Sequence, residues 1–209
     1  MGYAPRMSAS ASTATASRTT SLRRLLEQGT SGAEITRFLD GLSPQERVEE
    51  VLTVQGKWVG RLYDAMEGSP LTSVEELVPA DLTGTLIYEG RNSLPMFTRF
   101  QKRFTRMGGV VVGYNHQTLS FVTGPGYFVV KPPTGQGPLG QEAYFDYTEA
   151  APGEPAGWPA YKPNTAGLSR AVYAHMKDYV RKVARGVVVG KAYKNDVDQG
   201  AWFTLSRAI

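Results

Sequence analysis

The sequence contains no cysteine and only two histidines, His116 and His175. The absence of cysteine excludes disulfides, thiolate nucleophiles and zinc or iron–sulfur centres held by cysteine. Two histidines are too few for a histidine-rich metal site, so we expect neither a metal nor a cofactor. A chain without cysteine tolerates either redox compartment, and we take a reducing cytoplasm as the default.

Long apolar runs and the common catalytic strings are also missing. No stretch approaches the roughly 18 apolar residues of a membrane span, and no early segment has the apolar run of a secretory signal. The chain has no Walker A loop, no H-E-x-x-H and no G-x-S-x-G string. Gly124-Pro125-Gly126 is expected between strands, with no helix N-terminus behind it to receive a phosphate. These absences exclude most nucleotide-dependent and hydrolytic mechanisms.

Two basic segments, residues 1–26 and residues 91–106, contain no acidic residue. They account for the excess of positive over negative side chains that gives the net charge of +4. Such a patch attracts anionic lipids, nucleic acid or the carboxylate or phosphate of a ligand. A solvated face that keeps the protein soluble is the simpler interpretation. We expect no nucleic-acid partner, because the aromatic residues alternate with glycine and valine rather than lysine.

The length of 209 residues and the hydrophobic content of 41% suffice for one domain with a sizeable core. Residues 1–20 are rich in serine, alanine and threonine, which predicts a disordered arm. The arm fits either a targeting segment or a start codon placed too early, with Met7 as the alternative start. Residues 21–209 are then a single domain, with helices over about 21–67.

Two serines predict the starts of helices in this N-terminal part. Ser31 and Ser43 are each followed three residues later by glutamate, which is the spacing of a capping box. The first helix is expected to end at Gly41 and the second to cover about 44–67. Trp58 lies between two glycines in the second helix, and we interpret it as a helix residue that packs on the core.

From residue 83 onward the pattern favours strands. Strands are predicted at residues 85–89, 109–117, 118–123, 126–131, 142–148, 186–194 and 200–206. Apolar residues at helical spacing predict two helices, one over 94–106 and one from Leu168 to Val183. The Pro/Gly-rich connector 150–166 is long enough for a lid or rim loop. The fold class is therefore α+β, with an antiparallel sheet rolled into a partial or closed barrel and helices packed outside or at one end.

Residues 172–207 carry a resemblance to a known family. Asp178-Tyr179-Val180-Arg181 precedes a Gly190-Lys191-Ala192 strand and a final aromatic strand that ends in Leu205-Ser206-Arg207. This order resembles the C-terminal end of small bacterial lipocalin-like proteins of the GXWXG type, and Gly56–Gly60 supplies a G-x-W-x-G string. The resemblance implies a barrel whose apolar interior holds a fatty acid, polyketide, isoprenoid or tetrapyrrole. It implies no catalytic residues.

The candidate catalytic residues are Tyr114, His116 and Asp146. Tyr114 and His116 share one face of a strand, and Tyr144 and Asp146 share a face of a later strand. If these faces point inward, the barrel holds a phenol, an imidazole and a carboxylate in an apolar shell, which suits general acid–base catalysis. Alternatively, the three residues satisfy one another's hydrogen bonds at a rim. The candidate ligand-binding residues are Tyr144, Tyr127, Phe121, Arg99 and Arg103.

Three functions remain open at this stage. The first is binding of a hydrophobic small molecule with a polar or acidic end inside a barrel pocket. The second is a cofactor-independent cyclase or isomerase on the same scaffold. The third is a membrane-surface or partner-binding protein that uses the basic segment 94–106, with Phe97, Phe100 and Phe104 as its apolar face. Packing of these phenylalanines in the core is the more common arrangement.

Overall fold

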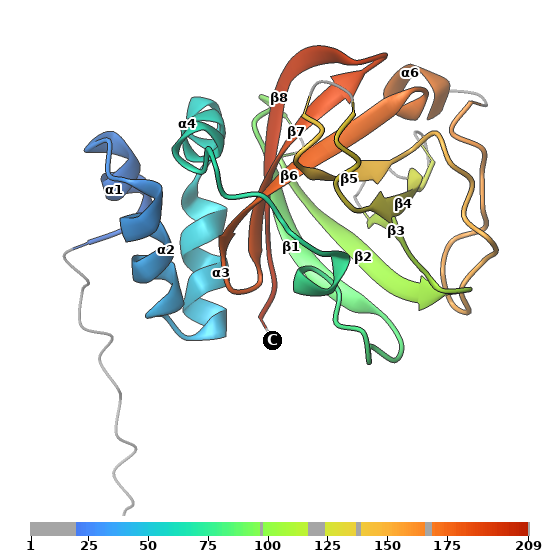
Figure 1. The fold of residues 1–209 in the computed structure, drawn as a ribbon, viewed down its shortest axis with the longest axis horizontal. Coiled ribbons are helices and arrows are strands. Elements are labelled where there is room, and N and C mark those ends of the chain that lie inside the picture. The colour runs from blue at the N-terminus through green and yellow to red at the C-terminus, as the bar shows by residue number, and fades with distance from the viewer. Residues whose placement is uncertain (1–19, 97, 117–123, 137–138, 166–168, 209) are drawn as a thin grey trace, which may run out of the picture.

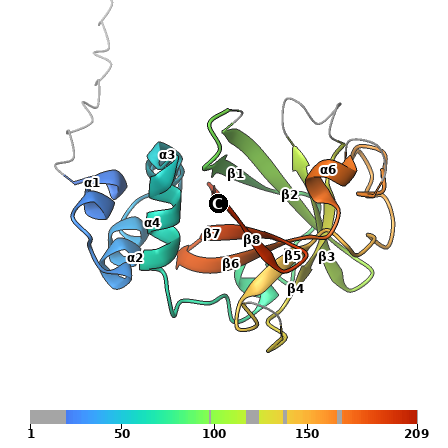
Figure 2. The same cartoon turned by 90° about the horizontal axis from the view of Figure 1, so that it is seen from above.

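A computed structural model describes residues 20–96, 98–116, 124–136, 139–165 and 169–208. The predicted strand 118–123 lies outside the described residues, as does the predicted arm 1–20 apart from Thr20. The described chain forms a layer of helices on one side and a closed β-barrel on the other (Figure 1). Figure 2 shows from above that the helices cover only one side of the barrel.

The barrel has eight antiparallel strands, each paired with the next along the chain, and the last strand pairs with the first. The strands are β1 (Leu86–Asn92), β2 (Arg99–Met107), β3 (Val110–His116), β4 (Tyr127–Lys131), β5 (Ala143–Asp146), β6 (Met176–Ala184), β7 (Val187–Lys194) and β8 (Val197–Ser206). This is the up-and-down order found in lipocalins. The predicted α+β fold with a closed antiparallel barrel is confirmed.

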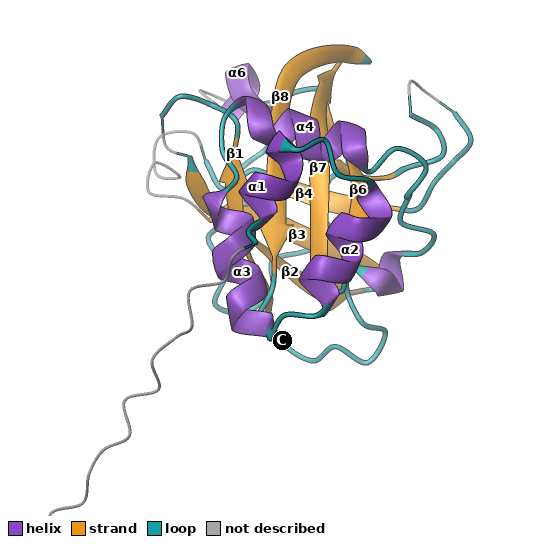
Figure 3. Cartoon of the chain, turned by 90° about the vertical axis from the view of Figure 1, so that its left-hand side faces the viewer, coloured by secondary structure: helices purple, strands orange, loops and turns teal. Residues whose placement is uncertain are grey.

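Four helices precede the barrel and pack on its outer wall, against β6, β7 and β8 (Figure 3). They are α1 (Leu22–Glu27), α2 (Gly32–Asp40), α3 (Pro44–Thr53) and α4 (Lys57–Ala65). Two shorter helices, η1 (Val74–Glu76) and α6 (Ser169–Tyr173), lie in connections. Within the described ranges, no helix has the length and apolar character needed to cross a bilayer.

Both predicted capping boxes mark helix starts. The side chain of Ser43 accepts a hydrogen bond from the Glu46 backbone, and the Glu46 carboxylate accepts one from the Ser43 backbone. Ser31 likewise accepts from the Glu34 backbone at the start of α2. These bonds satisfy amide groups that have no partner within the helix.

The single helix predicted over 44–67 is wrong, because the chain breaks it into α3 and α4. Gly56 lies between them with a φ of 56°, a conformation that glycine adopts without steric cost. Gly60 then faces β8, where a Cβ atom would lie 3.3 Å from the Trp202 ring. Trp58 lies in α4 and packs against the core between helices and barrel, so its interpretation as a helix residue is confirmed.

The helices predicted over 94–106 and from Leu168 to Val183 are also wrong. These segments form β2 and β6, and only Ser169–Tyr173 is helical. Residues four apart share a face both on a helix and on a strand, so spacings such as Phe100 to Phe104 fit either structure. Barrel closure decides between them, since β2 and β6 each pair with a neighbour on both edges.

A buried cluster on the outer wall fixes the helices to the barrel. Tyr63 of α4 donates a hydrogen bond to Glu142 at 2.8 Å, and Arg181 of β6 donates to the other oxygen of the same carboxylate at 2.8 Å. Arg181 also donates to the Tyr63 backbone carbonyl, and its guanidinium lies 3.9 Å from the centre of the Tyr63 ring. Arg181 of β6 therefore forms an ion pair with Glu142, which directly precedes β5.

The Tyr63→Phe substitution tests this attachment. We expect it to lower the free energy of unfolding by about 1–2 kcal/mol, because it leaves an oxygen of the buried Glu142 carboxylate without its donor. Denaturant unfolding measures the change. Tyr193→Phe is the matched control, because the Tyr193 hydroxyl makes no hydrogen bond within the described part of the chain. Equal losses in the two variants would contradict a specific role for the Tyr63 hydroxyl.

Candidate functional site

A lysine lies inside the barrel. Lys102 occupies the inward face of β2 between Phe100 and Phe104, and only 2% of it is exposed. Its ammonium nitrogen lies within 5.8 Å of the centres of five aromatic rings, those of Phe100, Phe128, Phe145, Tyr147 and Phe203. A buried charge in apolar surroundings is costly unless it has hydrogen-bond partners and a counter-charge.

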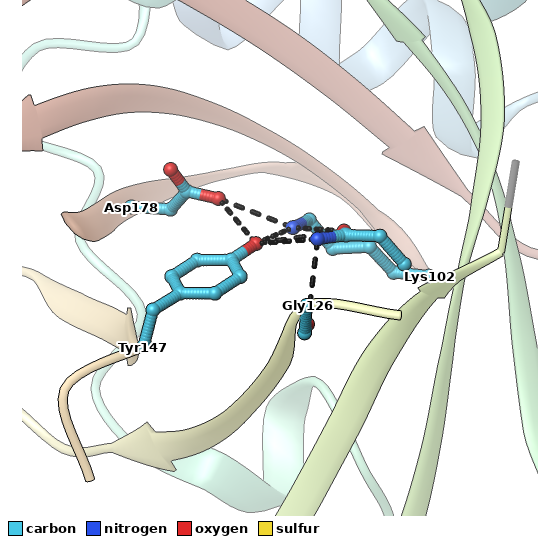
Figure 4. Close-up of polar contacts among 5 residues, drawn as sticks. Lys102, Gly126, Tyr147 and Asp178 are labelled. Atoms are coloured by element: carbon cyan, nitrogen blue, oxygen red, sulfur yellow. Dashed lines mark hydrogen bonds and ion pairs between the residues drawn. The ribbon is translucent and has the colours of Figure 1, made fainter. Parts of the chain in front are cut away.

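Three residues supply those partners (Figure 4). The Lys102 ammonium donates to Asn115 Oδ1 at 2.8 Å, to the Tyr147 hydroxyl, and to Asp178 Oδ2 at 3.1 Å. Each of its three protons therefore has an acceptor. Asn115 comes from β3, Tyr147 directly follows β5, and Asp178 comes from β6. We call these four residues the Lys102 network.

The other members of the network are also bonded to one another. The Tyr147 hydroxyl accepts from Asn115 Nδ2 at 3.1 Å and donates to Asp178 Oδ2 at 3.1 Å. Asn115 Nδ2 also donates to the carbonyl of Gly126 at 3.5 Å. The Tyr147 ring stacks on Tyr173, with centroids 5.4 Å apart and planes 9° apart. The network is therefore held rigidly from several strands.

Burial changes the acid–base properties of two members. Burial lowers the pKa of Lys102, and the neighbouring Asp178 carboxylate partly opposes this effect. Burial and the charge of Asp178 together raise the pKa of Tyr147 well above its usual value. The phenol therefore keeps its proton at neutral pH and acts as a hydrogen-bond donor to Asp178. The lysine is easier to deprotonate than one in water.

The network lies at the inner end of a pocket of about 230 Å³ at one mouth of the barrel. The pocket walls are mainly apolar, and they include Phe100, Tyr173, Met176, Ala192, Ala201 and Phe203. At the rim, Leu94 and Val172 are exposed. An apolar pocket with a few converging polar groups is the usual form of a small-molecule site.

Tyr114 and His116 lie on the outer face of β3. The inward residues of this strand are Val111 and Gly113, followed by Asn115 of the network. Tyr114 is covered by Trp158 of the connector, with ring centroids 4.7 Å apart. His116 is largely exposed. The partial desolvation of its ring and the nearby positive charge of Arg103 lower its pKa.

Asp146 also lies on the outer face, with its carboxylate turned to its own chain. Its Oδ1 accepts from the backbone and the hydroxyl of Thr148 at 2.8 Å and 2.6 Å. Within the described residues, no hydrogen bond joins Asp146 to His116 or Tyr114. Tyr114, His116 and Asp146 therefore point away from the barrel interior, and the catalytic role expected of them stays a prediction.

Most of the candidate ligand-binding residues also lie outside the barrel. Tyr127 packs against Trp158 and Tyr161 of the connector, and Tyr144 packs against Tyr179 on the outer wall. Arg99 is exposed, and Arg103 donates to Gln101 and to the Tyr114 hydroxyl. Phe121 lies outside the described residues. None of those described lines the mouth pocket.

Two residues of the Lys102 network are sequence neighbours of the predicted catalytic residues. Asn115 lies between Tyr114 and His116, and Tyr147 follows Asp146. A shift of one position moves a side chain to the opposite face of the sheet, so the residues next to the predicted ones are those that point into the barrel. Lys102 could have been found from the sequence. On a strand it shares a face with Phe100 and Phe104, so it is a charged residue on an otherwise apolar face.

The donor groups of the network suit an organic ligand better than a metal ion. No group of three or more histidine, cysteine, aspartate or glutamate side chains arranged to hold a metal ion occurs among the described residues. The network itself offers a single carboxylate beside an ammonium group, which repels cations.

Comparisons of this chain with protein-family models, with curated proteins and with solved structures found no match. The resemblance of residues 172–207 to lipocalin-like proteins therefore stays a prediction. Any statement about function has to come from the site itself.

Proposed function

We propose that this protein binds a small hydrophobic molecule at the mouth of its barrel, with the polar end of the ligand directed to the Lys102 network. The observation that carries the proposal is a charged, fully hydrogen-bonded network at the inner end of an apolar pocket. Apolar walls favour a hydrocarbon body, and converging polar groups orient one end of it.

The rest of the barrel interior limits where a ligand fits. Phe104, Phe128 and Phe145 fill the space behind the network and are fully buried. Their rings contact one another, with centroids 5.0–5.6 Å apart. An eight-stranded barrel is just wide enough either to be filled by side chains or to hold one small ligand. This barrel does both, with side chains inside and room for a ligand at the mouth.

The charge of the network favours a neutral polar end over an acidic one. The ammonium of Lys102 is already balanced by the carboxylate of Asp178 at 3.1 Å. A ligand carboxylate would add a second negative charge to this buried site without a second cation. A hydroxyl or carbonyl oxygen adds none. We therefore narrow the polar or acidic end expected from the sequence to a neutral oxygen group.

Two alternative functions are less well supported by the placement of their residues. A cyclase or isomerase that uses Tyr114, His116 and Asp146 needs these side chains in one cavity, and they lie on the outer wall. A membrane-surface role for the segment 94–106 needs its phenylalanines exposed, but Phe100 and Phe104 pack inside the barrel. The Lys102 network, in contrast, places an amine, a phenol and a carboxylate beside an apolar pocket.

Displacement of a neutral fluorescent apolar probe, N-phenyl-1-naphthylamine, tests the proposed function. We expect 1-octanol to displace the probe and octanoate to displace it at least about 10-fold more weakly, because of the unbalanced charge. Ala192→Trp places a large ring in the pocket, and we expect it to weaken 1-octanol binding by about 10-fold or more.

Val197→Trp is the matched control for this experiment. Val197 lies on β8 with 62% of its surface exposed, and it does not line the pocket. This variant adds the same ring and should bind 1-octanol as the unmodified protein does. Equal binding by the Ala192→Trp variant would overturn the proposed site, and tighter binding of octanoate would overturn the argument for a neutral polar end.

A further inference from the structure

We infer that Lys102 is an amine nucleophile that captures an aldehyde or ketone entering the barrel mouth as a covalent imine. The inference rests on the proposed function, since the carbonyl compound must first bind in the same pocket. It goes beyond binding because it assigns a covalent reaction to a particular nitrogen atom.

The first support is the position of the amine. Lys102 is buried, yet it belongs to the lining of the mouth pocket. A carbonyl carbon that enters along the apolar walls meets the ammonium group at the inner end. The other lysines of the chain differ in this respect, because none of them lines this pocket.

The second support is a proton acceptor beside the amine. An ammonium group is not nucleophilic, and Lys102 must first lose one proton. Asp178 Oδ2 lies 3.1 Å from the Lys102 nitrogen, and the Tyr147 hydroxyl bridges the two groups. Apolar surroundings lower the free-energy cost of moving a proton from the ammonium to the carboxylate, since the product is a neutral amine and a neutral acid in place of two buried charges.

The reaction balances with these groups alone. The neutral Lys102 amine attacks the carbonyl carbon, so that a C–N bond forms and the C=O π bond breaks, and a proton moves from the attached nitrogen to the oxygen to give a carbinolamine. Asp178, now protonated, returns its proton directly or through Tyr147 to the carbinolamine oxygen, which leaves as water. The nitrogen then gives its last proton to the regenerated carboxylate or keeps it as an iminium ion. No oxidant, reductant or metal is consumed.

Trapping with octanal and sodium cyanoborohydride tests the inference on the full chain. The reductant converts an imine into a stable N-octyl lysine, which intact mass and peptide mapping locate. We expect labelling at Lys102 to exceed labelling at each of the seven other lysines by at least about 10-fold. An excess of 1-octanol, which occupies the pocket and has no carbonyl group, should suppress labelling at Lys102 only.

Two variants refine the test. Tyr147→Phe keeps the ring and removes the bridging hydroxyl, so we expect the rate of trapping at Lys102 at saturating octanal to fall by about 100-fold. In Lys102→Met/Asp178→Asn, which removes both charges, octanal should label only surface lysines. If Lys102 is trapped at the same rate in the Tyr147→Phe variant as in the unmodified protein, the tyrosine takes no part in proton transfer.

Failure of this inference is distinguishable from failure of the proposed function. Labelling spread over surface lysines, with 1-octanol still displacing the fluorescent probe, overturns the imine and leaves the binding site standing. No displacement by 1-octanol overturns the proposed function. Labelling of Lys102 that 1-octanol does not suppress also overturns the inference, because the aldehyde then reaches the amine by a route other than the pocket.

Discussion

The Lys102→Met substitution is expected to lower the free energy of unfolding by about 3–5 kcal/mol. Methionine replaces the aliphatic part of the lysine side chain well, so little packing is lost. The cost arises at Asp178, which is 5% exposed and must either keep its negative charge without a counter-ion or take up a proton. Removing one member of a buried ion pair costs far more than the pair contributes to stability.

The double variant Lys102→Met/Asp178→Asn gives the contrast that identifies this cause. With both charges removed, we expect most of the stability to return, to within about 1 kcal/mol of the unmodified protein. Chemical denaturation of the unmodified protein, both single variants and the double variant completes a double-mutant cycle. The two single losses should be strongly non-additive.

Additive losses would contradict a coupled ion pair and would indicate that Lys102 contributes through packing alone. The single Asp178→Asn variant adds a further check. It leaves the lysine without its carboxylate, so the pKa of Lys102 should fall further, because burial then acts without the opposing charge. The stability of this variant should also decline, because the buried lysine then either keeps its charge without a counter-ion or releases a proton at a cost.

The sequence pattern predicted the barrel, but it predicted helices for the segments that form β2 and β6. Segments 126–131 and 186–194 begin with glycine and carry short continuous apolar runs, which are typical of buried strands. They form β4 and β7. The segments of β2 and β6 carry apolar residues four apart, a spacing that both periods share. Only hydrogen bonding to a neighbouring strand on each edge decides between helix and strand for these segments. This pairing depends on the whole sheet and cannot be read from the segment alone.

The site was missed for a related reason. The sequence indicated the correct strands, since Asn115 and Tyr147 adjoin His116 and Asp146. It did not indicate which face of each strand points inward, because both faces are apolar. Tyr114 and Tyr127 are as buried on the outside as Phe128 is on the inside, since the connector covers them through Trp158. In a barrel whose outer face is exposed to solvent, polar and apolar residues alternate along each strand, and the apolar residues identify the inner face.

Glycines on the inner wall give the second large expected effect. Gly190 lies on β7 beneath the ring of Phe203, and a Cβ atom at this position would lie 2.2 Å from Phe203 Cζ. We expect Gly190→Val to lower the free energy of unfolding by about 3 kcal/mol, because Phe203 must leave its position in a closely packed interior. Thermal and denaturant unfolding measure this loss.

Two further variants separate the clash from a general effect of losing glycine. Gly190→Val/Phe203→Ala removes the ring, so its loss should be smaller than the sum of the two single losses. Gly41→Ala, at a helix end where the added atom meets only ordinary contacts, should leave the stability unchanged or slightly higher. Additive losses at Gly190 and Phe203 would contradict the clash.

The same substitution connects stability to the site. Phe203 forms part of the pocket wall, and its ring centre lies 5.0 Å from the Lys102 nitrogen. If Phe203 is displaced toward the pocket, 1-octanol binding should weaken together with stability. Gly113 offers a comparison behind the network, because its Cβ would lie 2.4 Å from the ring of Phe128, which does not line the pocket. Gly113→Ala should therefore destabilise the barrel and reduce binding less than Gly190→Val does, which places the ligand on the mouth side of the lysine.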